Sequence, residues 1–382
     1  MKPTSKFFCK APFTEMSIDP RGEILPCCRY EGILSALKDE RIDKAWNNKN
    51  YKDLRTRFLN GEKPKECIDC WNAEESGNVS LRQSINLMAQ DIDFDSNIVE
   101  KPPLYYEFKL SNRCNLKCRM CYASNSSSIA KETKINPLVI LETTTPEERK
   151  HLLSNKIIGT HHEQIVFEWI KSAKYILFAG GEPFINKEIK TIIQYIENQK
   201  LSKDIEVLLI TNGTYWDDKF VSQLKNFKKL KFTISIDDIY ERNDYQREMS
   251  DFNVIEENLI KFSSIFHKKI NFNCTINWYN IWEIEEFFKY ADDINIPVSV
   301  QFVTAPVHLN IINLPIKIKK LINEKYKSST DERIKLIVNR LNLPGKDLSF
   351  NFFNHVKHYD KLRNNSFTDV FSEWSRILLN EK

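Results

Sequence analysis

From Leu104 onward, short apolar runs alternate along the chain with longer amphipathic stretches. Short apolar or β-branched runs are typical of buried strands, and apolar positions three and four apart predict helices. The predicted strands are Leu104–Leu110, Lys174–Ala179, Ile205–Thr211, Leu230–Ile236, Ile270–Ile276 and Pro297–Val303. The predicted helices are Glu163–Ser172, Lys187–Gln199, Asp217–Asn226, Asn253–His267, Trp282–Ala291 and Ile311–Tyr326. This alternation predicts an α/β fold with a parallel sheet.

The predicted fold class is a partial (β/α)6 TIM-like barrel preceded by a small cysteine-rich domain. In such barrels the reactive side chains lie at the carboxyl ends of the strands. Before Leu104 the pattern changes to turns, paired cysteines and a short helix predicted at Ile42–Asn60. We therefore expect the cysteine-rich domain at residues 1–101, the barrel at 102–310 and a helical extension at 311–382.

The crossover between the first two predicted strands is unusually long and runs from Tyr122 to Ala173. Its middle, LETTTPEERK, is polar. A substrate-facing insertion and a surface loop are both open interpretations.

The charge balance of the chain does not indicate an anionic partner. Lys and Arg exceed Asp and Glu by 56 − 52 = +4 over 382 residues, a balance that gives no argument for nucleic acid or an anionic membrane. No apolar run approaches the ~18 residues needed to cross a bilayer, and the amino-terminal sequence lacks the apolar segment of a signal peptide. We expect a cytoplasmic protein with no membrane partner and no clear nucleic-acid binding. The oligomeric state is left open.

The nine cysteines fall mainly into two groups, which in a reducing cytosol favours metal ligation over disulfides. Cys114, Cys118 and Cys121 form a CxxxCxxC motif directly after the first predicted strand. Three thiolates can hold three irons of a 4Fe–4S cluster and leave the fourth iron open to a small molecule. Zinc would need a fourth ligand, and His161 and His162 lie far off in sequence.

Further motifs follow at the predicted strand ends. The second strand leads into Gly180, Gly181, Glu182 and Pro183, where glycines let backbone approach a ligand and the glutamate can accept from an ammonium. The third strand ends in a Thr-Asn-Gly-Thr turn containing Asn212, the fourth in Ser235-Ile236-Asp237, and Arg247 lies ten residues beyond Asp237.

Taken together, the cysteine motif and these turns resemble the radical S-adenosylmethionine (SAM) superfamily, from Leu104 to about Pro306. The resemblance implies that a reduced cluster cleaves SAM to a 5′-deoxyadenosyl radical, which abstracts a hydrogen atom from a substrate. It also implies an electron donor such as flavodoxin or ferredoxin. By resemblance, the following residues contact SAM: Met120 or Tyr122 near the adenine, Gly180, Gly181, Glu182 and Pro183 at the methionyl amino group, Asn212 on a turn facing the cofactor, Ser235 and Asp237 near the ribose, and Arg247 at the carboxylate.

The amino-terminal cysteines Cys9, Cys27, Cys67 and Cys70 can complete one 4Fe–4S cluster or bind one tetrahedral zinc, and spacing does not choose between them. The pattern Cys-x12-Gly-x4-Cys followed by CxxC resembles the auxiliary-cluster module called SPASM, or its short form called twitch, placed here before the barrel. The resemblance implies a second 4Fe–4S cluster that transfers electrons or positions a substrate. We interpret Cys28 as a spare thiol.

Cys274 lies in a predicted strand whose alternation favours a core position. A thiol facing the barrel interior could instead donate a hydrogen atom to a substrate radical, so Cys274 is also a candidate catalytic residue. The first functional hypothesis is a radical SAM enzyme acting on a peptide or protein side chain. The alternatives are the same chemistry on a small molecule, such as a sugar or aminocyclitol, and a non-catalytic zinc-binding protein.

Overall fold

The computed structural model describes residues 5–75, 79–135, 163–266 and 269–380. Its contacts divide the chain into two compact units, each described here by itself. Unit 1 comprises Met1–Cys114, Pro146–Ile210 and Asp217–Leu230, and unit 2 comprises Asn115–Thr145, Thr211–Trp216 and Lys231–Lys382. The polar middle of the long crossover and the pair His161 and His162 lie outside the described residues.

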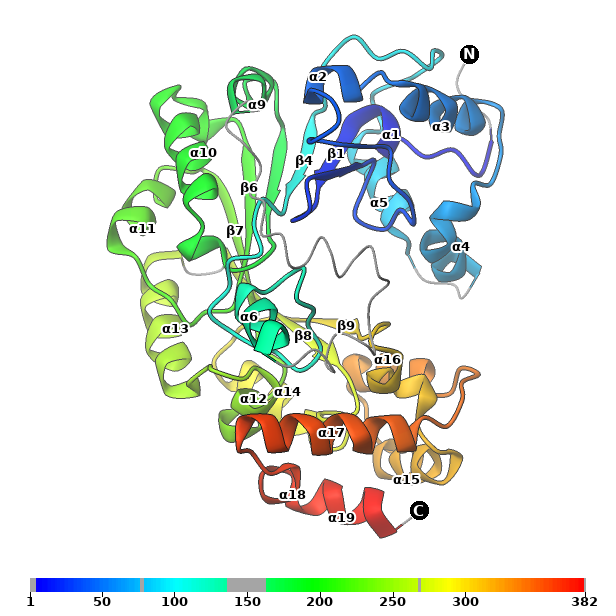
Figure 1. Cartoon of the computed structure of the whole chain (residues 1–382), viewed down its shortest axis with the longest axis vertical. Coiled ribbons are helices and arrows are strands. Elements are labelled where there is room, and N and C mark those ends of the chain that lie inside the picture. The colour runs from blue at the N-terminus through cyan, green and yellow to red at the C-terminus, as the bar shows by residue number, and fades with distance from the viewer. Residues whose placement is uncertain (1–4, 76–78, 136–162, 267–268, 381–382) are drawn as a thin grey trace. The chain divides into compact units, whose positions relative to one another are not determined.

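Unit 1 is built on a mixed sheet (Figure 1). Its strands follow the order β3-β2-β1-β4-β5-β6, with parallel pairing of β1 with β4, of β4 with β5 and of β5 with β6, and antiparallel pairing of β2 with β1 and β3. Their bounds are β1 Glu15–Ile18, β2 Glu23–Leu25, β3 Ser35–Ala36, β4 Tyr105–Phe108, β5 Tyr175–Phe178 and β6 Glu206–Thr211.

The amino-terminal segment shares this sheet with the first predicted barrel strand. Strand β1 lies parallel to β4 in a register that pairs Glu15 with Tyr105 and Ile18 with Phe108. Beyond the strand, the Lys109 amide donates to the Ile18 carbonyl at 2.9 Å. Sequence patterns did not predict β1. Its residues Glu15–Ile18 alternate polar and apolar, but the strand has only four residues, and its polar face is buried as well.

The helices of unit 1 follow their sequence signals. The predicted helix Ile42–Asn60 is two helices, α2 Ile42–Ala45 and α3 Lys49–Leu59, because Asn48 caps α3 by accepting the Tyr51 amide. A Ser80/Gln83 capping box begins α5. The remaining helices are α1 Ala11–Thr14, α4 Ile68–Glu75, α5 Leu81–Met88, α9 Glu163–Ile170, α10 Lys187–Asn198 and α11 Asp218–Leu224.

Unit 2 contains three parallel strands, β7 Lys229–Ser235, β8 Ile270–Ile276 and β9 Val298–Phe302, with β7 beginning in unit 1. Along β8, buried Phe272, Cys274 and Ile276 alternate with half-buried Asn273 and Thr275. The other helices here are α6 Ser127–Ile135, α12 Tyr240–Gln246, α13 Phe252–Phe266, α14 Ile284–Asp293, α15 Ile316–Tyr326, α16 Glu332–Leu341, α17 Ser349–Arg363, α18 Phe367–Val370 and α19 Ser372–Asn380.

All six predicted strands are confirmed as β4 to β9, and all six predicted helices are found with shifted ends. The largest shift is in the last helix, which was predicted from Ile311 and begins at Ile316, because Pro315 caps it and a short 3-10 helix precedes it. The three-domain division stays a prediction. Among the described helices, none has the length and apolar character needed to cross a membrane.

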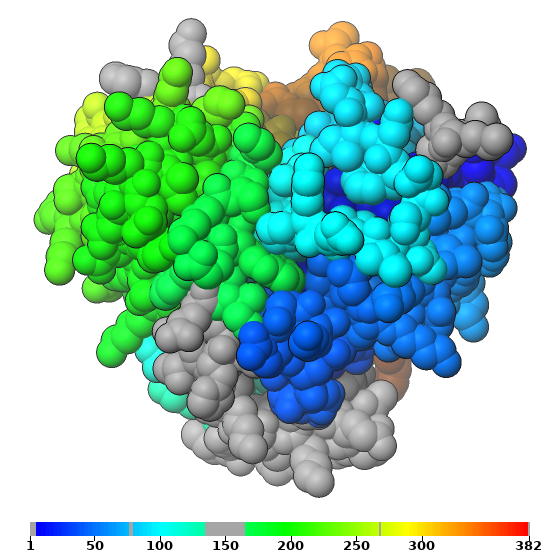
Figure 2. Space-filling view, turned by 90° about the horizontal axis from the view of Figure 1, so that it is seen from above, coloured from blue at the N-terminus to red at the C-terminus, as the bar shows by residue number. Residues whose placement is uncertain are grey.

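A cavity of about 550 Å³ lies at the amino ends of β1 and β4, between Thr14, Leu104 and the segment 92–102. In Figure 2, dark-blue amino-terminal residues are visible between the cyan residues of this region. Because reactive groups of such barrels gather at the opposite, carboxyl ends of the strands, this cavity lies away from the predicted site.

Candidate active site

The glycine turn after β5 supports the segment that leads into Cys114. Gly180 and Gly181 have φ values of +76° and +60°. A Cβ on Gly181 would lie 2.2 Å from the Arg113 carbonyl oxygen, so only glycine fits there. The Glu182 amide donates to the same carbonyl at 2.7 Å. This turn therefore fixes the backbone just before the first cysteine of the motif.

Glu182 is fully buried, and its Oε1 accepts the Phe184 amide at 3.0 Å. Pro183 begins the short 3-10 helix Pro183–Ile185 that this contact caps. The carboxylate thus stabilises the turn itself, in addition to the ammonium contact expected for it.

In unit 2, the Thr-Asn-Gly-Thr turn holds Asn115, which directly follows Cys114. The Asn212 side-chain amide donates to Asn115 Oδ1 at 3.0 Å, and Asn115 Nδ2 donates to the Thr214 hydroxyl at 2.7 Å. Gly213 has a φ of +75°, and its carbonyl accepts from Asn258 at 2.9 Å. The turn therefore fixes the backbone just after the first cysteine.

The rest of the cysteine motif docks on the segment after α12. The Lys117 amide donates to the Glu248 carbonyl at 2.9 Å, and the Arg119 amide donates to the Gln246 carbonyl at 2.8 Å. Within the loop, the Cys121 amide donates to the Cys118 carbonyl at 3.0 Å. Met120 and Tyr122 are half-buried on this loop.

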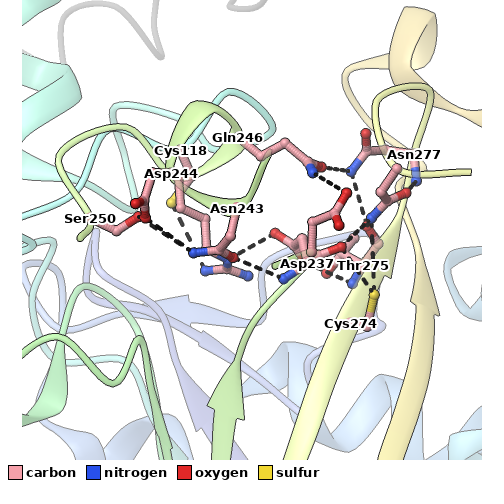
Figure 3. A network of polar contacts seen from close by, with 12 residues as sticks. Cys118, Asp237, Asn243, Asp244, Gln246, Ser250, Cys274, Thr275 and Asn277 are labelled. Atoms are coloured by element: carbon pink, nitrogen blue, oxygen red, sulfur yellow. Dashed lines mark hydrogen bonds and ion pairs between the residues drawn. The ribbon is translucent and has the colours of Figure 1, made fainter. Parts of the chain in front are cut away.

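Arg247 contacts both Asp237 and Cys118 and so joins them in one polar network. Asp237 and Cys118 are labelled in Figure 3. The fully buried Asp237 carboxylate accepts the Thr275 amide at 2.8 Å and forms an ion pair of 2.8 Å with Arg247 Nε. Arg247 Nη1 lies 4.0 Å from Cys118 Sγ. Burial raises the pKa of the Cys118 thiol, and the Arg247 charge opposes that increase. Arg247 thus connects the turn after β7 with the cysteine motif.

Ser235 is the last residue of β7 and is half-buried. Cys274 is fully buried on the same face of β8 as Phe272 and Ile276, and its thiol donates to the Asp237 carbonyl at 3.6 Å. That position supports the interpretation of Cys274 as a core residue. Hydrogen-atom donation by this thiol stays a prediction.

Helix α17 contributes residues that sequence reasoning missed. The Arg119 side chain, between Cys118 and Cys121, is fully buried and forms a 2.9 Å ion pair with Asp360. Its guanidinium lies 3.6 Å from the centroid of the Tyr245 ring. Tyr245 Oη donates to the same Asp360 oxygen at 2.6 Å. The C-terminal extension therefore holds the cysteine loop from one side.

Glu132 of α6 makes a second such connection. It forms ion pairs with Lys117 of the cysteine loop at 2.9 Å and with Arg363 of α17 at 2.8 Å. Both the Glu132 and the Arg363 side chains are at least nine-tenths buried. Helical spacing on α17 places Asp360 and Arg363 one turn apart, but nothing local to the sequence indicates their distant partners.

The four auxiliary cysteines all belong to unit 1. Cys9, Cys27 and Cys70 are buried, Cys67 is half-buried, and Cys28 is exposed. Burial raises the pKa of the Cys9 thiol, and Cys67 and Cys70 lie near enough for their charges to raise it further. Burial also raises the pKa of Cys67 to about 12. The structure therefore gathers these thiols in a largely buried environment.

Arg82 is a further residue of the auxiliary site that spacing did not reveal. Burial raises the pKa of the Cys70 thiol, and both the main-chain N–H and the positive charge of Arg82 oppose that increase. The same charge acts to lower the pKa of Cys9 and of Cys67. The guanidinium is held by an ion pair of 2.6 Å with Glu74 and by a 2.7 Å hydrogen bond to the Phe8 carbonyl. A positive charge and an N–H donor at the sulfurs suit an anionic thiolate cluster.

Two family profiles match this chain. The radical SAM superfamily matches residues 108–304, and the SPASM iron–sulfur cluster-binding domain matches residues 9–71. The chain belongs to the radical SAM superfamily and carries an amino-terminal SPASM domain. Its fold is the predicted partial (β/α)6 barrel preceded by an auxiliary-cluster domain, and its cofactors are SAM and 4Fe–4S clusters.

Curated relatives share part of the chain. "Fe-coproporphyrin III synthase" of Methanosarcina barkeri is 26% identical over 225 residues, which cover 56% of this chain and 47% of that protein. The chain thus spans about half the length of this relative. "Antilisterial bacteriocin subtilosin biosynthesis protein AlbA" of Bacillus subtilis is 27% identical over 142 residues, 36% of this chain and 25% of that protein. A solved structure described as "Native anSMEcpe with bound AdoMet" is 17% identical, covers 68% of this chain and 62% of that chain, and has a TM-score of 0.39.

Proposed function

We propose that this chain is a radical SAM enzyme that cleaves SAM reductively and abstracts a hydrogen atom from a peptide or protein side chain. The observation that carries the proposal is the combination, in one chain, of the CxxxCxxC barrel with a SPASM domain. The relative named for subtilosin biosynthesis supports a peptide as the substrate. When bound, the reduced cluster and SAM supply the 5′-deoxyadenosyl radical.

The chain's own residues would hold these cofactors. Cys114, Cys118 and Cys121 are proposed to bind three irons of the SAM-binding cluster. Arg247, 4.0 Å from Cys118 Sγ, is placed to attract an anionic group such as the SAM carboxylate next to that cluster. The Arg247 Nε forms an ion pair with Asp237, and this contact fixes the direction of the Arg247 side chain.

The glycine turn would supply the methionyl end of the SAM site. Gly180 and Gly181 present backbone without side chains, and Glu182 holds that backbone in place. Asn212 follows β6, Ser235 ends β7 and Asp237 lies two residues beyond it, at the strand ends where the ribose is expected.

The auxiliary domain is proposed to transfer an electron or to position the substrate. Strand β1 of that domain pairs with β4, and Cys27 follows β2 by two residues. The auxiliary thiols therefore belong to the same sheet assembly as the strand that leads into Cys114. Flavodoxin or ferredoxin is the proposed source of the reducing electron.

A small molecule is the second candidate substrate. The relative named Fe-coproporphyrin III synthase favours it, because that name specifies a product that is not a peptide. The same hydrogen abstraction on a sugar or aminocyclitol would give oxidation or epimerisation.

The proposal is tested by anaerobic reconstitution with iron and sulfide, followed by SAM and dithionite. We expect about eight irons per chain, as two 4Fe–4S clusters require, and release of 5′-deoxyadenosine detected by mass spectrometry. Cys118→Ala should abolish that release, whereas the matched variant Cys28→Ala, at an exposed thiol, should retain it. Cleavage that survives in Cys118→Ala would overturn the assignment.

The substrate class is tested with host extract from cells grown in deuterated medium. The extract is separated into a peptide and protein fraction and a small-molecule fraction, and each is incubated with the reconstituted chain and SAM. Deuterium in 5′-deoxyadenosine from the first fraction supports a peptide substrate, and deuterium only from the second supports the alternative.

A further inference from the structure

One face of the unit 1 sheet carries ionisable side chains in its interior. Because side chains alternate along a strand, the parallel register of β1 with β4 places Glu15 and Ser17 on the same face as Tyr105 and Glu107. Lys109 continues that face beyond the end of β4. The opposite face carries the apolar core, including Met16 and Phe108.

Glu107 is satisfied within this group. Its Oε2 accepts the Ser17 hydroxyl at 3.1 Å, and its Oε1 forms a 2.8 Å ion pair with Lys109 Nζ. Glu107 is 6% exposed, and these two contacts offset part of the cost of burying its carboxylate.

Glu15 is not satisfied in the same way. It is only 9% exposed, yet its carboxyl accepts no hydrogen bond from the described part of the chain. Lys109 acts on it through its charge, while its hydrogen-bonding contact is with Glu107. If both carboxyls were ionised, Lys109 would neutralise only one of them, and the uncompensated charge would be that of Glu15.

An unpaired carboxylate is costly to bury. Burial raises the pKa of Glu15 well above its usual range, and the neighbouring Glu107 charge raises it further. A cation placed against Glu15 would restore the ionised form and supply the missing hydrogen bonds.

The neighbours of Glu15 include an auxiliary cysteine. After burial, the charge of Glu15 is the next cause that raises the pKa of the Cys27 thiol. Tyr175 of β5 pairs in register with Tyr105. Burial raises the pKa of Tyr175, and the charges of Glu15 and Glu107 add to that increase. A ligand at Glu15 would therefore lie on a strand of the auxiliary domain that pairs with the barrel strand β4.

We propose that Glu15 of the auxiliary domain, supported by Glu107 and Lys109, binds a primary ammonium group of the substrate on the sheet of unit 1. The inference deepens the proposed function, since it takes the cation to be part of the substrate. A lysine side chain of a peptide and a small amine share this chemistry, so the test contains both.

The test is ligand-observed saturation-transfer NMR on the anaerobically reconstituted full chain. The probes are n-butylammonium, Nα-acetyl-lysine methylamide, and n-butanol as the uncharged counterpart. We expect both ammonium probes to bind and n-butanol not to bind. Tighter binding of Nα-acetyl-lysine methylamide indicates a peptide lysine, and tighter binding of n-butylammonium indicates a small amine.

Glu15→Gln keeps the size of the side chain and removes the charge, and we expect it to weaken ammonium binding at least tenfold. The matched control Glu62→Gln, at an exposed glutamate of the same unit, should bind as the unaltered chain does. If Glu15→Gln does not fold, Glu15→Asp should bind with reduced affinity, since the charge is kept at a shorter reach. Equal binding of butanol and butylammonium, or unaltered binding in the folded Glu15→Gln or Glu15→Asp variant, would overturn the inference. Because this readout needs no SAM cleavage, its failure is distinct from failure of the proposed function.

Discussion

At the scale of single residues, buried charges determine the arrangement around Cys118. Asp237 and Arg247 are both almost completely buried, and each is the main compensation for the other. The sequence indicated these two residues as separate contacts to SAM. The structure adds that they form an ion pair, so that replacing one also affects the other.

Asp237→Asn tests this ion pair. The variant leaves Arg247 buried without its counter-ion, and removing one partner of a buried pair typically costs about 3–5 kcal/mol. We expect the reconstituted variant to unfold at a lower urea concentration than the unaltered chain. Circular dichroism measures the midpoint of unfolding. Asp293→Asn, at an exposed aspartate of unit 2, is the control and should change stability by less than about 0.5 kcal/mol. Equal midpoints for the two variants would show that the pair contributes little.

Glycine geometry explains part of the motif at the same scale. Gly181 is required because its positive φ and its approach to the Arg113 carbonyl leave no room for a Cβ. The sequence predicted close approach of a ligand at this turn. The structure shows that close approach to the chain's own backbone already requires glycine.

At the scale of elements, α17 decides how the cysteine loop is held. Asp360 receives Arg119 and Tyr245 on one oxygen, while its other oxygen accepts the Phe367 amide at 2.8 Å. Arg363 reaches the same loop through Glu132 and Lys117. The helical extension therefore supports the cysteine loop that is proposed to hold the SAM-binding cluster.

Asp360→Asn is expected to loosen the cysteine loop, because Arg119 loses its counter-ion while it remains buried. Iron should be lost to a chelator at least several-fold faster from the SAM-binding cluster, and 5′-deoxyadenosine formation should fall by about tenfold or more. Iron release is followed by absorbance, with Cys118→Ala marking the contribution of the auxiliary cluster alone.

The control for that experiment is Asp369→Asn, at an exposed aspartate on α18. It should release iron at the rate of the unaltered chain. The role assigned to α17 is wrong if both variants behave alike.

At the scale of the whole molecule, two sets of cysteines are proposed to hold two clusters with different tasks. The SAM-binding set leaves one iron open, whereas four cysteines fill every position of the auxiliary cluster. The two clusters should therefore be separable by substitution.

The double variant Cys67→Ala and Cys70→Ala should lose the auxiliary cluster and keep the other. We expect iron to fall from about eight to about four per chain, with SAM cleavage continuing at a reduced rate. Iron analysis and mass spectrometry of 5′-deoxyadenosine check the two parts. Loss of all iron would instead show that the auxiliary cluster is needed for folding of the whole chain.

Sequence by itself determined the barrel strands β4 to β9 and the three-cysteine motif, and it found the turns that follow β5, β6 and β7. These features are local, because strand periodicity and ligand spacing are written within a few consecutive residues. It also separated the auxiliary cysteines from the SAM-binding ones by their positions along the chain.

Tertiary structure alone decided three other features. It paired β1 with β4, joined Arg119 to Asp360 across 241 positions of sequence, and buried Glu15 where no residue of the described part of the chain donates a hydrogen bond to it. Each depends on which distant segments pack together, and the free energy of burying a charge is set by those neighbours rather than by adjacent residues. For that reason the chemistry that begins the reaction could be predicted from sequence, while the support of the cysteine loop and the proposed ammonium site required the fold.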